Sequence, residues 1–112
     1  MKNKFDFILI KPQLGENIGA CARSLKNFGF SKLSIVSPKQ SWPNNKAKAT
    51  SVGAYDIIKK AKIYENTHEA ISNYNIVVSL SARKRDINKK HISINQFFKI
   101  IKSKKKTKFG LM

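Results

Sequence analysis

Three arginines stand out in a chain whose other 20 basic residues are all lysine. Arg23 lies in a segment with a helical pattern, and Arg83 and Arg85 flank Lys84 in a short polar run. The planar guanidinium group can bind phosphate through two parallel hydrogen bonds, which a lysine ammonium cannot do. It can also stabilise negative charge that develops on an oxygen during a reaction. The arginines are therefore the first candidates for contacts with a phosphate-bearing substrate.

A turn rich in small and polar residues precedes Arg23. It contains Gly15, Glu16 and Asn17, and Gly19 follows one helical turn later. The two glycines form neither a dinucleotide-binding nor a P-loop pattern, so their spacing favours a tight turn and close helix packing over phosphate binding. Asn17 is suited to cap the following helix, and its side chain could also orient a neighbouring loop.

The net charge of the chain predicts a polyanionic partner. The 23 Lys and Arg residues face only six Asp and Glu residues, which leaves a formal charge of +17. Such a surface gains affinity for nucleic acid through the release of counterions from phosphates. The alternative is a merely basic surface, because an A/T-biased genome also enriches Lys, Asn and Ile. That bias does not explain the scarcity of acids.

The sequence leaves two interpretations open for each charged candidate, one functional and one not. Arg23 directly follows the apolar Ala22, so it is either an ordinary solvated residue or a functional one. The Arg83-Lys84-Arg85 run is either an exposed charge cluster or a specific contact with RNA.

Other classes of site have little support in the sequence. Cys21 lies on an apolar helical stripe and is expected in the core, and His68 and His91 do not complete a ligand set at zinc spacing. No metal site is predicted. The chain contains no apolar run of the roughly 20 residues that cross a bilayer and no cleavage-site pattern, so we expect a cytoplasmic protein with no membrane partner.

The elements that must position these residues alternate along the chain. The predicted strands cover residues 5–11, 32–36, 62–64 and 76–80, and residues 109–112 resemble the opening of another strand. The predicted helices cover residues 17–28, a stretch from 46 to 60 that Gly53 interrupts, a stretch from Asn66 or Thr67 to residue 73, and a helix that starts at Ser93 with a capping box to Gln96. This alternation predicts an α/β domain with a mostly parallel sheet and helices on both faces. We expect one domain over residues 1–112.

In such a sheet, ligands collect outside the carboxyl ends of the strands. The turn before Arg23 and the segment of residues 81–86 both leave the sheet at that edge. We therefore expect Arg23, Arg83 and Arg85 to converge on one cationic surface for a ribose-phosphate chain.

Three segments also carry a family resemblance. They read KPQLGENIGACARSLKNFGFSKLSIVSP, GAYDIIKKAKIYENTHEAI and SARKRD. Together they resemble the amino-terminal region of the SpoU class of SPOUT RNA 2′-O-methyltransferases, closest to its TrmJ-type tRNA methyltransferases, over essentially the whole chain. The first segment is the most specific, because its Asn-Ile-Gly-Ala-Cys-Ala-Arg run lies between a strand that ends at Pro12 and a strand that ends before Pro38.

The resemblance implies a fold, a reaction and a set of site residues. The fold is the Rossmann-like amino-terminal half of an α/β-knot, and the reaction transfers a methyl group from S-adenosylmethionine to a ribose 2′-hydroxyl of tRNA, such as an anticodon-loop cytidine or uridine, or of rRNA. Members of the family form homodimers. The implied catalytic residues are Arg23 and Asn17, and the implied RNA-binding residues are Glu16, Arg83, Lys84 and Arg85.

The chain departs from the family in its carboxyl-terminal part. The knot that holds the methyl donor uses a Gly-rich, Glu-containing turn and a Ser/Asn-Leu-rich segment, and neither occurs in this sequence. We therefore expect a truncated SPOUT domain that lacks the cofactor site and the dimer interface and that alone neither binds S-adenosylmethionine tightly nor methylates RNA. Two alternatives are a non-catalytic RNA-binding α/β module and an unrelated small nucleotide-binding domain.

Overall fold

A five-stranded parallel sheet forms the centre of the computed structural model, which describes residues 5–39, 42–80, 92–103 and 108–112. Its strands are β1 (Phe5–Ile10), β2 (Leu33–Val36), β3 (Lys62–Tyr64), β4 (Ile76–Val78) and β5 (Phe109–Leu111). Their order across the sheet is β3-β2-β1-β5-β4, and each neighbouring pair is parallel. All carboxyl ends therefore lie at one edge of the sheet, and all amino ends at the opposite edge.

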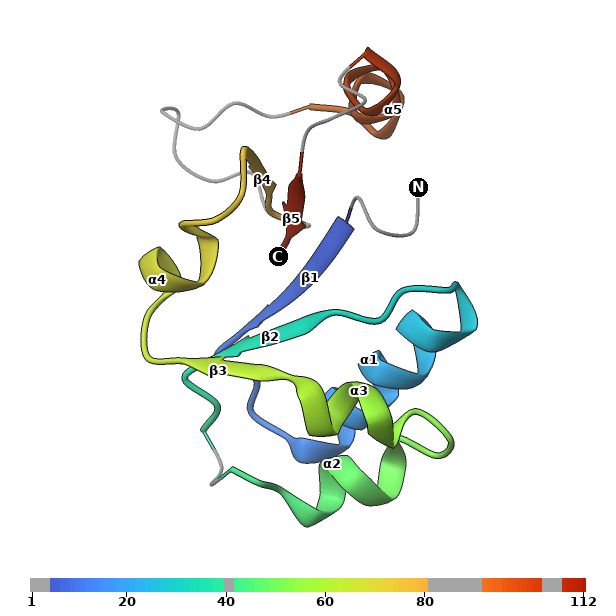
Figure 1. The fold of residues 1–112 in the computed structure, drawn as a ribbon, viewed down its shortest axis with the longest axis vertical. Helices are drawn as coiled ribbons and strands as arrows, with labels where there is room; N and C mark the ends of the chain where they lie inside the picture. Colours follow the sequence, from blue (N-terminus) through green and yellow to red (C-terminus); the bar gives the residue numbers. More distant parts are fainter. Residues whose placement is uncertain (1–4, 40–41, 81–91, 104–107) are drawn as a thin grey trace.

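The helices in the described part of the chain cover the two faces of the sheet unevenly. They are α1 (Gly15–Asn27), α2 (Asn45–Thr50), α3 (Tyr55–Lys60), α4 (Thr67–Ile71) and α5 (Ile94–Ser103). From β1 to β2 to β3, each new strand is added on the same side of the previous one, and β5 is added to β4 in that same direction. Right-handed crossovers therefore put α1, α2, α3 and α5 on one face. The connection from β3 to β4 runs the opposite way and puts α4 on the other face. In Figure 1, α1, α2 and α3 gather at the lower right and α4 stands apart on the left.

The face under α1, α2 and α3 holds the main hydrophobic core. Leu33 and Ile35 of β2 alternate toward these helices and are nearly inaccessible to water. Beside them, Phe5 of β1, Phe109 of β5 and Phe97 of α5 form an aromatic cluster with ring centroids 5.3–6.2 Å apart. The other members of the main core are Ala54, which precedes α3, and the helical residues Ile18, Ala22, Leu25, Ala47, Ile57 and Ile58.

The opposite face, under α4, is more polar. Ile8, Val36 and Ala70 form a small buried cluster there. Next to it, the buried carboxylate of Asp6 accepts a hydrogen bond from the Tyr74 hydroxyl, at 2.7 Å between the oxygens. This bond joins β1 to the end of the α4 segment, 68 residues later in the chain.

Most of the predicted architecture is confirmed. The sheet is parallel, helices lie on both faces, and Gly29 and Gly53 adopt positive φ angles where the predicted helices end or break. The Asn66 side chain accepts a hydrogen bond from the Glu69 amide at the start of α4, and the predicted capping box of Ser93 and Gln96 forms both of its hydrogen bonds.

The predicted helix cap at Asn17 is wrong. Helix α1 begins two residues earlier, with Leu14 in the extended capping conformation and without a side-chain cap. Asn17 lies in the first turn, and its amide donates to the Leu14 carbonyl at 3.2 Å. The earlier start brings Gly15 into contact with Asn44, a tertiary contact that local capping preference does not anticipate.

The predicted buried strand over residues 76–80 is shorter and more exposed than expected. β4 covers Ile76–Val78, which is half-buried, and Leu80 is 69% exposed. The reason is that β4 is an outermost strand of the sheet, with β5 as its one described partner strand.

Replacing Tyr74 by Phe should lower the free energy of unfolding by about 1–3 kcal/mol near neutral pH, because the buried Asp6 carboxylate loses a donor. Burial, and then the hydrogen bond to Asp6, raise the pKa of the Tyr74 hydroxyl above its usual value of 10.0. The stabilisation is therefore fully present below the tyrosine pKa of the unfolded chain, and it is lost as pH rises through the raised pKa.

Urea denaturation at about pH 7, 9 and 11 checks this prediction. The difference between the wild type and Tyr74→Phe should be equal at the two lower values and smaller at the highest. Tyr55→Phe is the control, because the Tyr55 side chain is exposed. A Tyr74→Phe variant as stable as the wild type near neutral pH would contradict the assigned role.

Candidate functional site

The carboxyl edge of the sheet carries strained backbone at the ends of two adjacent strands. Lys11 follows β1 and Ser37 follows β2, and each has a φ of 47°. The Lys11 amide donates to the Val36 carbonyl and the Ser37 amide to the Tyr64 carbonyl, both at 2.8 Å. Residues other than glycine rarely adopt this left-handed conformation, and it concentrates at functional sites. These hydrogen bonds fix the points at which the chain leaves β1 toward α1 and leaves β2 toward α2.

Helix α1 is held at this edge by unusually close contact with α2. A Cβ atom added at Gly19 would clash with the Thr50 hydroxyl and would lie 2.6 Å from the Ala47 carbonyl oxygen. A Cβ atom at Gly15 would clash with the Asn44 side chain. The interpretation of both glycines as helix-packing residues is therefore confirmed.

The side chain of Asn44 also sets the start of α2. Its oxygen accepts hydrogen bonds from the amides of Lys46 at 2.9 Å and Ala47 at 3.1 Å. Asn44 thus caps α2 and contacts the first residue of α1. Sequence reasoning missed Asn44 and Thr50 as parts of this site. The available signal was the four-residue spacing of Gly15 and Gly19, which predicts a close partner but does not identify it.

Glu16 is the least satisfied polar residue of this region. One carboxylate oxygen, Oε1, is buried and has no hydrogen-bond partner among the described residues. The Glu16 carbonyl accepts a long hydrogen bond of 3.4 Å from the Thr50 hydroxyl. A buried acceptor without a donor costs about 1–3 kcal/mol, so this carboxylate is suited to a partner that brings a hydrogen-bond donor.

Asn17 and Arg23 lie on the outer surface of α1. Together with Ala20 they form an exposed ridge at three-residue spacing, on the side away from the core. Arg23 is six positions after Asn17 in the sequence, which corresponds to about 9 Å along the helix axis. Because the Ala20 side chain is small, the helix surface between Asn17 and Arg23 is recessed. Arg23 forms no ion pair with another described residue.

The predicted cluster of Arg83, Lys84 and Arg85 lies outside the described residues, as does His91. The structure does place the start of that segment. The Leu80 amide donates to the Met112 carbonyl at 2.8 Å, so the chain after β4 leaves at the same carboxyl edge as the chain after β1. Strand β5 lies between the two exits. Convergence of the three guanidinium groups stays a prediction.

The structure confirms the predicted core position of Cys21 and adds Trp42 to the residues around the core. Cys21 and Trp42 pack against the main core, and burial raises the pKa of the Cys21 thiol. Within residues 5–39, 42–80, 92–103 and 108–112, no three His, Cys, Asp or Glu side chains come together as metal ligands. Among the helices described here, none combines the length and the apolar character needed to span a bilayer.

Comparisons with known proteins agree with this geometry. The SpoU rRNA Methylase family matches residues 4–109. The tRNA (cytidine/uridine/adenosine-2′-O-)-methyltransferase TrmJ of Pseudomonas aeruginosa is 37% identical over 87 residues, which cover 78% of this chain and 34% of that protein. The tRNA (cytidine-2′-O-)-methyltransferase TrmJ of Methanocaldococcus jannaschii is 41% identical over 88 residues, which cover 78% of this chain and 38% of that protein.

The solved structures give the same result for the fold. The crystal structure of TrmJ from Z. mobilis superposes with a TM-score of 0.85 at 33% identity, over 95% of this chain and 48% of that one. The fold is therefore the Rossmann-like α/β half of the SPOUT architecture. The chain spans about a third of the length of the curated relatives and about half of the solved chain.

Replacing Gly19 by Ala should destabilise the protein by about 1–3 kcal/mol, because the added methyl group forces α1 and α2 apart. In an exposed helix the same change is stabilising by about 1 kcal/mol, so the sign of the effect is diagnostic. Chemical denaturation measures it, with Ser24→Ala on the exposed side of α1 as the control. An unchanged or increased stability of Gly19→Ala would contradict the close packing.

Proposed function

The chain belongs to the SpoU rRNA Methylase family, and from this we propose that it is the RNA-facing part of a tRNA ribose 2′-O-methyltransferase. The observation that carries the proposal is the similarity to TrmJ-type tRNA 2′-O-methyltransferases over 78% of the chain, together with the family match over residues 4–109, which includes Glu16, Asn17 and Arg23. Both of these relatives are named as tRNA 2′-O-methyltransferases. The net charge of +17 supports an RNA substrate.

Arg23 is proposed as the catalytic cation. A ribose hydroxyl is a poor nucleophile near neutral pH, and a guanidinium beside its oxygen, or beside the adjoining phosphate, stabilises the negative charge that develops there. Arg23 is exposed and forms no ion pair with the described residues, so its charge is available to a substrate. Asn17, on the same ridge of α1, is proposed to orient the ribose.

Glu16 is proposed to shape the turn at the start of α1 around the reacting ribose. Its buried oxygen lacks a donor in the described structure, and an RNA hydroxyl or a neighbouring segment of the protein can supply one. Arg83, Lys84 and Arg85 are proposed to contact the RNA backbone from the segment that leaves β4 at the same edge of the sheet.

S-adenosylmethionine, the methyl donor that the family implies, does not fit the described residues. The pocket at the amino edge of the sheet is lined by Lys32, Lys60, Lys62 and Lys108, whose charges repel the sulfonium of the donor. The two motifs expected to hold the donor do not occur in the sequence. The proposed enzyme therefore needs donor-binding residues that this chain does not supply, and we expect the family's homodimer contacts to come from the same part of the protein.

A second candidate function is a non-catalytic RNA-binding module. The observation in its favour is the net charge of +17, most of it carried by lysine. In this case salt-sensitive RNA binding survives Arg23→Ala and weakens when Arg83 and Arg85 are both replaced.

Arg23→Ala should lower the turnover number for tRNA methylation by about a hundredfold to a thousandfold, because the positioned cation is lost from the transition state. The dissociation constant for tRNA should change by less than about threefold, since one exposed charge contributes little to total affinity. Arg23→Lys should recover part of the activity. The assay follows tritium transfer from labelled S-adenosylmethionine to unmodified tRNA by the complete gene product.

The charge-matched control is Lys59→Ala, which removes an exposed cation from α3 and should leave turnover unchanged. The 112-residue chain assayed alone should be inactive and should bind the methyl donor weakly by calorimetry. Methyl transfer by the chain alone would contradict the need for further residues. Failure of the complete product on both tRNA and rRNA would contradict the proposed function.

A further inference from the structure

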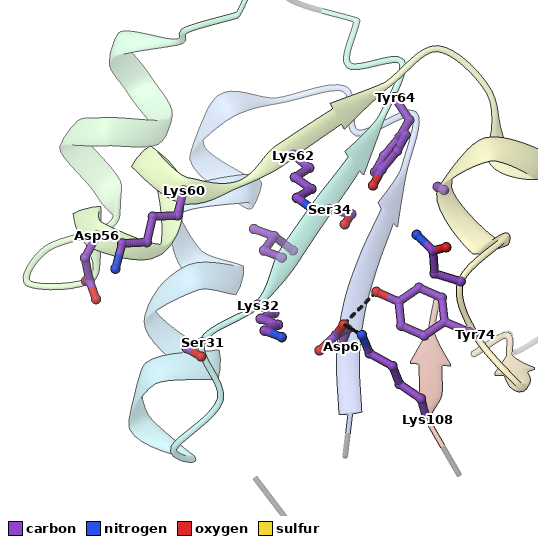
Figure 2. Close-up of a pocket in the computed structure, with 13 residues that line it drawn as sticks. Asp6, Ser31, Lys32, Ser34, Asp56, Lys60, Lys62, Tyr64, Tyr74 and Lys108 are labelled. Carbon is purple, nitrogen blue, oxygen red and sulfur yellow. Dashed lines mark hydrogen bonds and ion pairs between the residues drawn. The ribbon is translucent and has the colours of Figure 1, made fainter. Parts of the chain in front are cut away.

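A basic pocket lies at the amino edge of the sheet, opposite to the proposed catalytic edge. It has a volume of about 390 Å³ and opens on the face that carries α4. Its lining comes from the beginnings of β1 and β2, from β3, from Lys108 before β5, from α3 and from the α4 segment, as Figure 2 shows. We call it the amino-edge pocket. The residues used in the argument are Asp6, Lys32, Ser34, Lys60, Lys62 and Lys108.

The sheet register brings the cations of this pocket together. Lys32 immediately precedes β2, and Lys62 is the first residue of the neighbouring β3. Ser34 and Lys62 are register partners on adjacent parallel strands, so their side chains project from the same face. In Figure 2 the Lys62 side chain points toward Ser34, and the Lys32 side chain lies nearer the start of β2.

The acids of the pocket are already engaged. Asp6 is 5% exposed, accepts a hydrogen bond from Tyr74 at 2.7 Å, and has the Lys108 ammonium 3.9 Å away. Asp56 accepts a hydrogen bond of 2.9 Å from Lys26, which does not line the pocket. Neither carboxylate therefore balances the charge of the remaining lysines.

Three of the four pocket lysines have no counter-ion among the residues that the structure describes. Lys32, Lys60 and Lys62 form no side-chain hydrogen bond or ion pair with any described residue. Three ammonium groups around one concave surface repel one another, and an anion placed between them removes that repulsion. The hydroxyl of Ser34 and the amide of Asn73 add neutral donors to the same lining. This donor set matches phosphate oxygens.

We propose that the amino-edge pocket binds phosphate groups of the RNA backbone, as a second RNA contact separate from the ridge of Asn17 and Arg23. The inference rests on the proposed function, because RNA is the polyanion which that function supplies. The pocket lies toward the other end of the strands, and it combines residues of the α4 face, such as Asp6 and Ser34, with Lys60 at the end of α3. A bound RNA therefore contacts two sides of the domain, and the pocket fixes its position without taking part in methyl transfer.

The test compares two double variants that lose the same charge. Lys32→Ala with Lys62→Ala removes two pocket cations, while Lys59→Ala with Lys99→Ala removes two exposed cations from α3 and α5 that do not line the pocket. Binding of a fluorescently labelled tRNA transcript is followed by anisotropy over a range of salt concentrations, with this 112-residue chain and with the complete gene product.

We expect the pocket variant to bind about tenfold more weakly, and the magnitude of its log-log salt slope to fall by about 1.4 to 1.8, because two phosphate contacts are lost. The control variant should weaken binding less than about threefold. Lys32→Arg with Lys62→Arg should retain most of the affinity, and circular dichroism should show that all variants are folded.

Equal weakening by the pocket and control variants would overturn the proposal, since binding would then depend on total charge alone. Titration with inorganic phosphate separates an RNA contact from a site for free phosphate. Saturable phosphate binding that the pocket variant loses, with tRNA affinity unchanged, would also overturn it.

If the wild-type protein does not bind tRNA or rRNA at all, the proposed function fails together with the pocket. If it binds and methylates tRNA while the two double variants behave alike, the pocket assignment alone fails.

Discussion

The contact between α1 and α2 at Gly15 and Gly19 is the constraint on which the proposed catalytic surface depends. Any side chain at Gly19 would meet the backbone of α2, so the two helices can lie this close only because the glycines lack a Cβ atom. The contact fixes where α1 begins and how it is rotated. That rotation directs Ile18, Ala22 and Leu25 into the core and leaves Asn17 and Arg23 exposed. The position of the proposed catalytic cation is thus a consequence of helix packing.

The direction of the crossovers gives the two sides of the sheet different chemistry. Four of the described helices cover one face and bury its apolar side chains, whereas α4 alone covers part of the other face. The less covered face keeps the Asp6–Tyr74 hydrogen bond and the lysines of the amino-edge pocket. A parallel sheet also separates its two edges by the full strand length. The proposed catalytic surface and the proposed phosphate pocket can therefore contact one RNA at different places without competing for the same groups.

Local sequence patterns predicted the elements well where the determining interactions are local. Gly29 ends α1, Gly53 separates α2 from α3, and Asn66 and Ser93 form the expected caps, because each depends on residues within one turn. The predictions failed where a distant partner decides. The start of α1 is set by contact with Asn44, and the exposure of β4 follows from its place at the edge of the sheet.

The sequence by itself determined the α/β class, the parallel sheet, the cationic character and, through the segment around Asn17 and Arg23, the family. These properties follow from composition, from periodicity and from a contiguous motif, all of which are present in the order of residues. The tertiary structure alone decided that Gly15 and Gly19 pack against α2 and that an oxygen of Glu16 is buried without a described donor. It also brought lysines from separate strands into one pocket. The physical reason is that strand order and crossover direction set which distant residues become neighbours, and no local pattern encodes that adjacency.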